Sequence, residues 1–425
     1  MDDQGRTGRA GRRGGASLAP DAGQGRDADE GPGASEGPGV DEGPDVDEGP
    51  DVDEGPDVDE GPNVDEGEAM NPVDAIVLVG GKGTRLRPLT LTMPKPMLPT
   101  AGSPFLTHLL SRVAEAGIEH VVLGTSYRAA AFEAEFGDGS ALGLNMEYVT
   151  EERPLGTGGG IANVASRLQH DTVMVFNGDV LSGVDLAAML AAHHERDADV
   201  TLYLVRVADP RAFGSVPTDA DGNVLAFLEK TEDPPTDQIN AGCYIFKREV
   251  LERIPRGREV SVEREVFPAL LADGATVCGF VDSGYWRDMG TPEDFVRGSA
   301  DLVRGVVSSP VLAGRHGEQL ILDDATVAPG AVVIGGTVVG RGAQIGPGVR
   351  LDGAVIFDGA RIEAGTVVER SIVGFGARIG PRSLIRDGVI GDGADIGARC
   401  ELLRGARVWP GVVIPDCGIR YSSDA

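Results

Sequence analysis

The chain has 425 residues, enough for two domains and a tail, and 41% of them are hydrophobic, which permits a sizeable core. Its formal net charge of −29 argues against nucleic acid as a partner. No apolar run is long enough to span a membrane, no secretory signal pattern opens the chain, and the four cysteines are widely scattered, so the sequence predicts a cytoplasmic protein with reduced thiols and no membrane partner.

Residues 1–70 form an acidic, low-complexity segment. They contain 21 Asp and Glu against five Arg, a net charge of −16, and the unit Val-Asp-Glu-Gly-Pro-Asp recurs from Val40. A segment with so little to bury and so much like charge is predicted to be disordered. Met70 stands just before the first predicted strand and could be an alternative start of translation.

Residues 71–306 alternate between short apolar runs and helical patterns. Strands are predicted at 75–79, 120–124, 172–176, 200–207 and 241–246, and helices at 104–117 and 156–168. This alternation predicts an α/β, Rossmann-like domain around a mostly parallel sheet. Ligands of such sheets bind at the carboxyl ends of the strands.

The first predicted strand opens into a glycine-rich, basic loop, residues 80–90. From 75 to 114 the chain has no Asp or Glu but contains five cations, Lys82, Arg85, Arg87, Lys95 and Arg112. Backbone N–H groups and positive charge after a buried strand are typical of a phosphate-binding site. The spacings of the dinucleotide and P-loop fingerprints are absent. Lys95 lies between two prolines, which hold its ammonium at low entropic cost.

Asp179 follows the predicted strand 172–176 directly. A carboxylate at the carboxyl end of a central strand is well placed to hold Mg²⁺, which prefers few protein oxygens together with phosphate and water. Farther on, Thr291 and Pro292 predict a helix start, and Trp286 is expected in the core. The histidines before residue 200 show no partner pattern.

After a linker at 307–319, residues 320–425 repeat. The motif Gly-Ala-x-Ile recurs at steps of 17 residues, and apolar residues step by five or six. Hexapeptide spacing with glycine at the corners predicts a left-handed parallel β-helix. Related β-helices that transfer acyl groups use a histidine base, but His316 in the linker is the only histidine beyond residue 300. We therefore expect an assembly or regulatory module, and a homo-oligomer formed through it.

Residues 80–90 followed by Pro94-Lys95-Pro96 resemble the signature of the sugar-1-phosphate nucleotidylyltransferases, and residues 71–421 are similar to the mannose-1-phosphate guanylyltransferases of bacteria. The resemblance implies transfer of GMP from GTP to mannose 1-phosphate, giving GDP-mannose and pyrophosphate, with Mg²⁺ as cofactor. It implies that Arg85, Lys95 and Asp179 are catalytic, and that Asp179 and Asp288 hold the metal. Two alternatives stay open: a glucose-1-phosphate thymidylyl- or uridylyltransferase, and a non-catalytic subunit that senses GDP-mannose.

The same resemblance implies two sets of binding residues. Those for the nucleotide are Val79, Gly80, Gly81, Gly83, Thr84, Glu151, Gly156 and Thr157. Those for the sugar phosphate are Gly178, Gly214, Glu229, Lys230 and Asn240. Glu151 takes the family's base-reading position. A carboxylate only accepts hydrogen bonds, so it suits the paired donors of guanine, whereas a glutamine suits uracil or thymine better.

Overall fold

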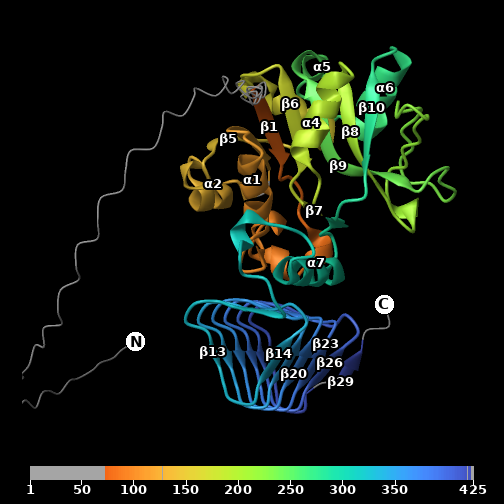
Figure 1. Ribbon diagram of the computed structural model, residues 1–425. Coiled ribbons are helices and arrows are strands. Elements are labelled where there is room, and N and C mark those ends of the chain that lie inside the picture. The colour runs from red at the N-terminus through yellow and green to blue at the C-terminus, as the bar shows by residue number, and fades with distance from the viewer. Residues whose placement is uncertain (1–71, 127, 419, 423–425) are drawn as a thin grey trace, which may run out of the picture. The chain divides into compact units, whose positions relative to one another are not determined.

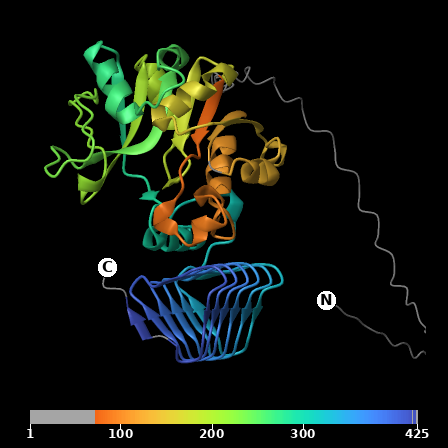
Figure 2. The ribbon, with the colours of Figure 1, turned by 180° about the vertical axis from the view of Figure 1, so that it is seen from behind.

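The computed structural model describes residues 72–126, 128–418 and 420–422, and these described residues belong to one compact unit. The predicted disordered tail and Met70 lie outside the described residues. Figure 1 and Figure 2 show an α/β part followed by a stack of short strands. The predicted fold class is confirmed, with a mostly parallel nucleotidyltransferase sheet and a β-helix after it.

A seven-stranded sheet in the order β10-β8-β9-β6-β1-β4-β5 forms the centre of the α/β part. Its strands are β1 (Val73–Leu78), β4 (His120–Thr125), β5 (Asn145–Thr150), β6 (Thr172–Asn177), β8 (Val200–Arg206), β9 (Gln238–Lys247) and β10 (Val277–Asp282). Strand β9 runs antiparallel to both neighbours, and the other pairs are parallel. The carboxyl ends of β1, β4 and β6 therefore meet at one edge.

Helices cover both faces of this sheet (Figure 1, Figure 2). Alternate residues of β1 point to opposite faces, so Ala75 and Val77 pack with α1, α2 and α4, and Ile76 packs with α3, α5 and α6. The helices are α1 (Phe105–Glu115), α2 (Ala130–Phe136), α3 (Gly156–Val164), α4 (Leu186–Glu195), α5 (Arg248–Glu252), α6 (Phe267–Ala272) and α7 (Pro292–Arg304), with a π-helical turn η7 (Val262–Val266).

Short elements connect the larger ones. Strands β7 (Val180–Ser182) and β11 (Trp286–Asp288) form an antiparallel pair, as do β2 (Pro99–Thr100) and β3 (Ser103–Pro104). The 3-10 turns are η1 (Thr84–Leu86), η2 (Leu89–Leu91), η3 (Lys95–Met97), η4 (Ser140–Leu142), η5 (Ala165–Arg167), η6 (Pro210–Ala212) and η8 (Pro310–Leu312). The predicted cap of α7 is found, because the Asp294 N–H donates to the Thr291 hydroxyl.

A buried carboxylate joins two histidines at the amino end of the sheet. Asp74 of β1 is fully buried and accepts from His120 Nδ1 at 2.7 Å and from His170 Nδ1 at 2.8 Å. Burial raises the pKa of Asp74, but these bonds and the N–H groups of Gln169 and His170 outweigh burial and hold it below its usual value. The sequence pattern did not reveal this partnership, because its members lie 46 and 96 residues apart.

From residue 319 onward the chain winds through three parallel six-stranded sheets. The first contains β12 (Gln319–Ile321), β15 (Thr337–Val339), β18 (Val355–Ile356), β21 (Ile372–Val373), β24 (Val389–Ile390) and β27 (Arg407–Val408). The second contains β13 (Thr326–Val327), β16 (Gln344–Ile345), β19 (Arg361–Ile362), β22 (Arg378–Ile379), β25 (Asp395–Ile396) and β28 (Val413–Ile414). The third contains β14 (Val332–Ile334), β17 (Arg350–Asp352), β20 (Val367–Glu369), β23 (Leu384–Arg386), β26 (Glu401–Leu403) and β29 (Arg420–Ser422).

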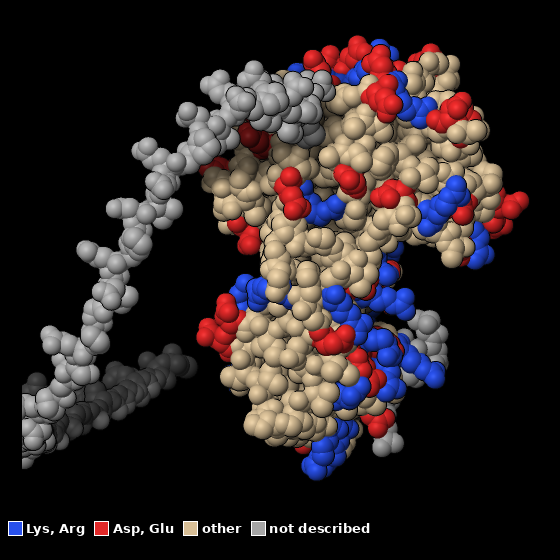
Figure 3. Space-filling view, in the orientation of Figure 1, with Lys and Arg blue, Asp and Glu red and all other residues tan. Residues whose placement is uncertain are grey.

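The sequence repeat coincides with these coils. The isoleucine of each Gly-Ala-x-Ile motif stands in register with that of the next coil, and the column fills the helix core. The glycine of each motif has φ between 62° and 70°, a backbone region that side chains disfavour. Ion pairs such as Arg370–Asp387 and Arg386–Glu369 link neighbouring coils, and basic and acidic groups mix on the face shown in Figure 3.

The first β-helix sheet shares a hydrophobic cluster with the α/β part. Val338, Val355, Phe357, Ile372 and Val389 pack in one group with side chains of the basic loop and of α7, namely Leu86, Leu89, Phe295 and Leu302. The β-helix therefore packs against the loop that carries Arg85. None of the helices in the described ranges has the length and apolar character needed to cross a membrane.

Candidate active site

Two carboxylates meet beside the carboxyl end of β6. Asp179 follows that strand, and Asp288 ends β11. Strand β11 pairs with β7 so that Asp288 stands opposite Val180, and the N–H of Met289 donates to the Asp179 carbonyl at 3.1 Å. This antiparallel pair thus brings together two acidic residues that are 109 positions apart in the sequence.

Lys95 lies between these carboxylates. Its Nζ is 2.9 Å from Asp179 Oδ2 and 3.6 Å from Asp288 Oδ1, and its side chain is only 9% exposed. On the other side, Arg85 Nη2 donates to Asp288 Oδ2 at 3.4 Å. The two cations offset the mutual repulsion of two acids in a partly buried place. The structure therefore joins all four residues predicted for catalysis and metal binding.

The donor set suits a hard divalent ion. Two carboxylates converge, whereas no group of three or more His, Cys, Asp or Glu among residues 72–126, 128–418 and 420–422 could form a metal site. Mg²⁺ is commonly held by one or two carboxylates together with substrate phosphates and water. The pair Asp179 and Asp288 fits that requirement.

The glycine loop owes its shape to close packing. Gly83 has φ of 56°, and a Cβ on it would lie 3.0 Å from Thr90 Cγ2 and 3.1 Å from Lys95 Cβ. A side chain at residue 83 would therefore strain the backbone and crowd Thr90 and Lys95. The hydroxyl of Thr90 donates to the Gly83 carbonyl at 2.8 Å and closes the loop.

A cavity of about 560 Å³ lies over this loop. Of the residues predicted to bind the nucleotide or the metal, it is lined by Gly80, Gly81, Glu151, Gly156, Thr157 and Asp179. It is lined as well by residues that the sequence analysis did not single out as nucleotide ligands, including Lys82, Ser126, Arg153 and Asn177. Val79, Gly83 and Thr84 belong to the segment that follows β1 but are not among the lining residues.

Glu151 and Glu152 both line this cavity, but Glu151 is half-buried and Glu152 is exposed. Burial raises the pKa of Glu151, and a long hydrogen bond from the Leu155 N–H, 3.4 Å, opposes that rise. A Cβ on Gly160 would lie 2.8 Å from Glu151 Oε1, so the glycines of α3 leave room for this carboxylate. Glu151, which was predicted to read the base, therefore lies at the cavity wall with its carboxylate close to the start of α3.

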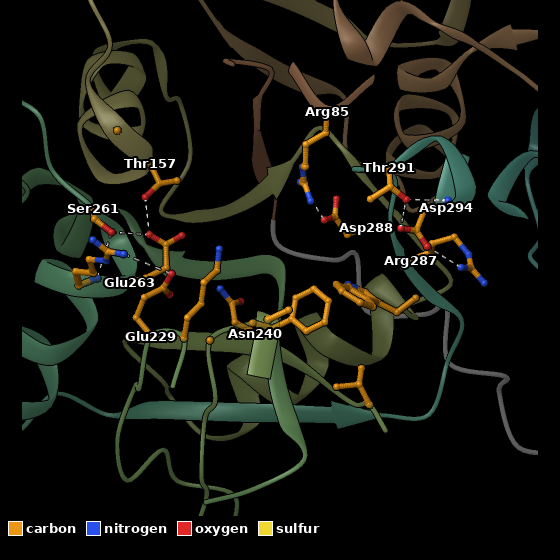
Figure 4. A pocket seen from close by; sticks show the side chains of 18 residues that line it. Arg85, Thr157, Glu229, Asn240, Ser261, Glu263, Arg287, Asp288, Thr291 and Asp294 are labelled. Carbon is orange, nitrogen blue, oxygen red and sulfur yellow. Dashed lines mark hydrogen bonds and ion pairs between the residues drawn. The ribbon is translucent and has the colours of Figure 1, made fainter. Parts of the chain in front are cut away.

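A second cavity, of about 810 Å³, shares Gly156 and Thr157 with the first (Figure 4). All but one of the residues predicted for the sugar phosphate line it, together with Arg85 and Asp288: Gly214, Glu229, Lys230 and Asn240. Asn240 is oriented by its own bonds, because its amide donates to the Tyr244 hydroxyl at 2.8 Å and its Oδ1 accepts from the Gly242 N–H at 3.1 Å. Gly178, the exception, packs against β1, where a Cβ would lie 2.6 Å from Val79 Cγ1.

Sequence reasoning missed one wall of the second cavity. Ser261, Glu263 and Arg264 belong to the cap and first residues of the π-helical turn η7, a local irregularity often found at functional sites. Glu263 Oε2 accepts from the hydroxyls of Thr157 and Ser261, both at 2.8 Å (Figure 4). Arg264 Nη2 lies 3.8 Å from Glu229 Oε1. The acidic and basic residues 261–265 offered no distinctive motif, so only the fold reveals them.

The opposite wall corrects one expectation. Trp286 was expected in the core; it does pack against the main hydrophobic cluster, but it is only half-buried because it also lines the cavity. There it packs edge-on against Phe213, with ring centroids 5.2 Å apart. Its Nε1 donates to the Ala241 carbonyl at 2.9 Å. The indole N–H needs an acceptor when the ring is buried, and the Ala241 carbonyl supplies it at this position. Arg287, Thr291 and Asp294 line the same wall.

Comparison with known families places this geometry in context. Residues 74–305 match the family model described as nucleotidyl transferase, and residues 315–419 match one described as the GMPPB C-terminal domain. A mannose-1-phosphate guanylyltransferase of Mycobacterium tuberculosis is 78% identical over 357 residues, which cover 84% of this chain and 99% of that protein.

A second curated relative and a solved structure are more distant matches. The catalytic subunit beta of mannose-1-phosphate guanylyltransferase from Drosophila pseudoobscura pseudoobscura is 38% identical over 231 residues, 54% of this chain and 62% of that protein. A crystal structure titled as a putative glucose-1-phosphate thymidylyltransferase from Bacillus anthracis covers 54% of this chain and 94% of its own, with a TM-score of 0.50 and 21% identity. That likeness concerns the fold alone.

Proposed function

Because the chain belongs to the nucleotidyl transferase family and to its mannose-1-phosphate guanylyltransferases, we propose that it transfers GMP from GTP to mannose 1-phosphate and releases pyrophosphate. The observation that carries the proposal is the junction of two cavities at Gly156 and Thr157, with Asp179 in one and Asp288 in the other. Two phosphorylated substrates placed in these cavities would meet beside Lys95.

The proposed reaction is an in-line displacement. An oxygen of mannose 1-phosphate attacks the α-phosphorus of GTP, a new P–O bond forms, and the bond to the β-phosphate oxygen breaks, so that pyrophosphate leaves with its electron pair and GDP-mannose remains. Such a step needs positioning and charge neutralisation more than a nucleophilic side chain.

In this scheme the chain's own residues divide the work. The backbone of Gly80 and Gly81 and the cation of Arg85 bind the triphosphate. Lys95 neutralises charge on the oxygens around the α-phosphorus. Asp179 and Asp288 would hold Mg²⁺, which supplies charge neutralisation and polarises the phosphate oxygens when bound.

The second cavity receives the sugar phosphate in the same scheme. Lys230 contacts the phosphate. The Glu229 carboxylate accepts hydrogen bonds from sugar hydroxyls, and the Asn240 amide exchanges hydrogen bonds with them. Gly214 has no side chain, so the sugar ring can approach its backbone closely. A side chain at this position would be crowded, because a Cβ would lie 3.0 Å from the Phe227 ring and 3.4 Å from Glu229 Oε2. Glu263 stands on the same wall, and we add it as a hydroxyl acceptor.

Base choice rests on Glu151. Its carboxylate accepts two hydrogen bonds, which suits N1–H and N2–H₂ of guanine and disfavours the single donor of uracil or thymine. This favours GTP over the thymidylyl and uridylyl alternatives. We further propose that residues 71–306 form the catalytic domain and 320–425 an assembly module, that the protein works in the cytoplasm, and that copies associate through the β-helix.

A pyrophosphate-release assay tests the proposal. The purified protein is given GTP, dTTP, UTP or ATP, each crossed with mannose 1-phosphate and glucose 1-phosphate, with Mg²⁺ or with excess chelator. We expect the highest kcat/KM for GTP with mannose 1-phosphate, and loss of turnover on chelation. Faster release from dTTP or UTP with glucose 1-phosphate would establish the alternative instead.

A further inference from the structure

One position of the β-helix breaks the pattern of its sheet. In the first sheet Val338, Val355, Ile372 and Val389 stand in register from coil to coil, and all four are buried in the cluster shared with the basic loop. The next residue of this column is Arg407. A charged residue where the repeat calls for an apolar one marks a departure from local consistency, which in natural proteins points to function.

The side chain of Arg407 leaves the β-helix and reaches the basic loop. Its Nη1 donates to the carbonyl of Arg85 at 2.8 Å and to that of Arg87 at 2.7 Å. These carbonyls flank Leu86, which is fully buried in the shared cluster. The 3-10 turn that carries Arg85 is thus held in two ways. Leu86 packs in the shared cluster, and the Arg407 guanidinium donates to the carbonyls of the residues on either side of Leu86.

The partners of Arg407 are main-chain oxygens, unlike those of several other arginines of the β-helix. Arg370, Arg378 and Arg386 of the β-helix each pair with a carboxylate. For Arg407 no carboxylate lies within 4.0 Å among the residues that the structure describes, and its bonds go to main-chain oxygens. A second hydrogen bond joins the β-helix to the segment just after the basic loop: the Thr92 hydroxyl donates to Asp392 Oδ2 at 2.7 Å.

We propose that Arg407 is a positioning residue for the reaction: it fixes the backbone of residues 85–87, and thereby the direction of the Arg85 side chain, from the last coils of the β-helix. This inference rests on the role proposed above for Arg85. The Arg85 side chain is 64% exposed, and its one ion pair among the described residues is the long bond to Asp288, so its placement depends strongly on the backbone that carries it.

The test is Arg407→Val, which restores the apolar residue of the repeat and should leave the coil folded. Arg386→Val, which removes an arginine paired with Glu369 on another sheet, is the matched control. Two readouts are needed: hydrogen exchange of the Leu86 and Arg87 amides in the full chain, which requires no activity, and steady-state kinetics with GTP and mannose 1-phosphate.

For Arg407→Val we expect exchange at these amides to accelerate about 10-fold or more and kcat to fall about 10- to 100-fold, since a misplacement of about 1 Å can cost that much. The KM for mannose 1-phosphate should stay within about twofold, and Arg407→Lys should recover part of kcat. Unchanged exchange would overturn the inference whatever the activity, as would unchanged kcat with an active wild type. If exchange accelerates in Arg407→Val but the wild type itself does not turn over these substrates, the proposed function and the catalytic role assigned here would be refuted.

Discussion

Lys95 shows how a single side chain can serve a site in two ways. Its ammonium lies within 4 Å of both Asp179 and Asp288, so it compensates their charges while the substrates are absent. Asp179 lines one cavity and Asp288 the other, so in the proposed reaction the same ammonium would also neutralise phosphate charge between them. The electrostatic demand on this position is therefore high in every state of the site.

We predict that Lys95→Ala or Asp179→Asn lowers kcat by about 10²- to 10³-fold, the effect of removing one preorganised charged group from a transition state. Lys247→Ala is the control, because Lys247 also bridges two carboxylates, Asp197 and Asp199, but lies outside both cavities. Pyrophosphate release and circular dichroism are measured on each variant. Near-normal turnover in the first two would refute the assignment.

Glu151 predicts a pH dependence of nucleotide binding. Burial raises its pKa above the ordinary 4.5, so on acidification it takes up a proton earlier than an exposed glutamate would. The protonated acid loses an acceptor for guanine. We expect the KM for GTP to rise as the pH falls toward this raised pKa, with little change at neutral pH.

Glu151→Gln should abolish that pH dependence and raise the KM for GTP about 10-fold, the usual cost of losing a hydrogen bond to a charged group. The ratio of UTP to GTP use should increase in the same variant. Glu152→Gln is the neighbouring control, since Glu152 is exposed. Equal effects of the two substitutions would show that neither carboxylate reads the base.

Among the elements, β1 carries the least expected residue, the buried Asp74. Its pKa is held below 3.8, so its ionised form stabilises the folded protein fully above the unfolded value of 3.8, and this contribution is lost as the pH falls through the lower, folded value. We predict that Asp74→Asn destabilises the protein by about 3 kcal/mol or more at pH 7, the typical cost of breaking a buried charged pair.

Urea unfolding at pH 7 and at pH 3 measures this effect. The difference between wild type and Asp74→Asn should shrink at pH 3. Asp171→Asn is a suitable control, because Asp171 lies at the same end of the sheet with an exposed side chain. A difference that stays constant with pH would mean that the ionised form of Asp74 does not supply the stability.

The corners of the β-helix give a second prediction at this scale. Gly376 has φ of 62° and open space around a would-be Cβ, so substitution there has only a conformational cost. Gly376→Ala should lower the unfolding free energy by about 1–2 kcal/mol. Gly376→Asn should cost less, because asparagine tolerates this region better. Equal losses in the two variants, measured by denaturant unfolding, would contradict the argument.

The elements also show what the sequence could and could not reveal. The β-helix was predictable because its repeat is local, with the same corner and core residue every 17 positions. The glycine loop and Lys95 were predictable because strand, turn and cation are contiguous. Glu263 was not, since its contact with Thr157 spans 106 residues, and neither was the place of Trp286 at the cavity rim. Contacts between segments that are distant in the sequence are set by the packing of the folded chain, and such packing produces no periodic pattern in the sequence.

At the scale of the whole molecule, the shared hydrophobic cluster joins the α/β part and the β-helix into one folding unit. Phe357 is 1% exposed in that cluster and packs on Phe375 with ring centroids 4.8 Å apart. We predict that Phe357→Ala destabilises both parts together, by about 3–5 kcal/mol. Val413→Ala, at a β-helix residue that is 71% exposed, should have little effect.

The chain's two tryptophans make this measurable. Trp286 lies in the α/β part and Trp409 in the last coils of the β-helix. Trp286→Phe and Trp409→Phe therefore give proteins in which fluorescence reports one part only. Coincident thermal transitions are expected in wild type and in Phe357→Ala. Two separate transitions in wild type would show that the cluster does not couple the parts.

The position of Arg407 late in the chain has a consequence for biosynthesis. A ribosome synthesises the basic loop some three hundred residues before the arginine that contacts it, since 322 positions separate Arg407 from Arg85. Because the loop packs in one cluster with the β-helix, a nascent chain can complete this loop only after its later coils have docked. We expect a copy that ends before residue 407 to turn over slowly, because it lacks the contact that holds residues 85–87.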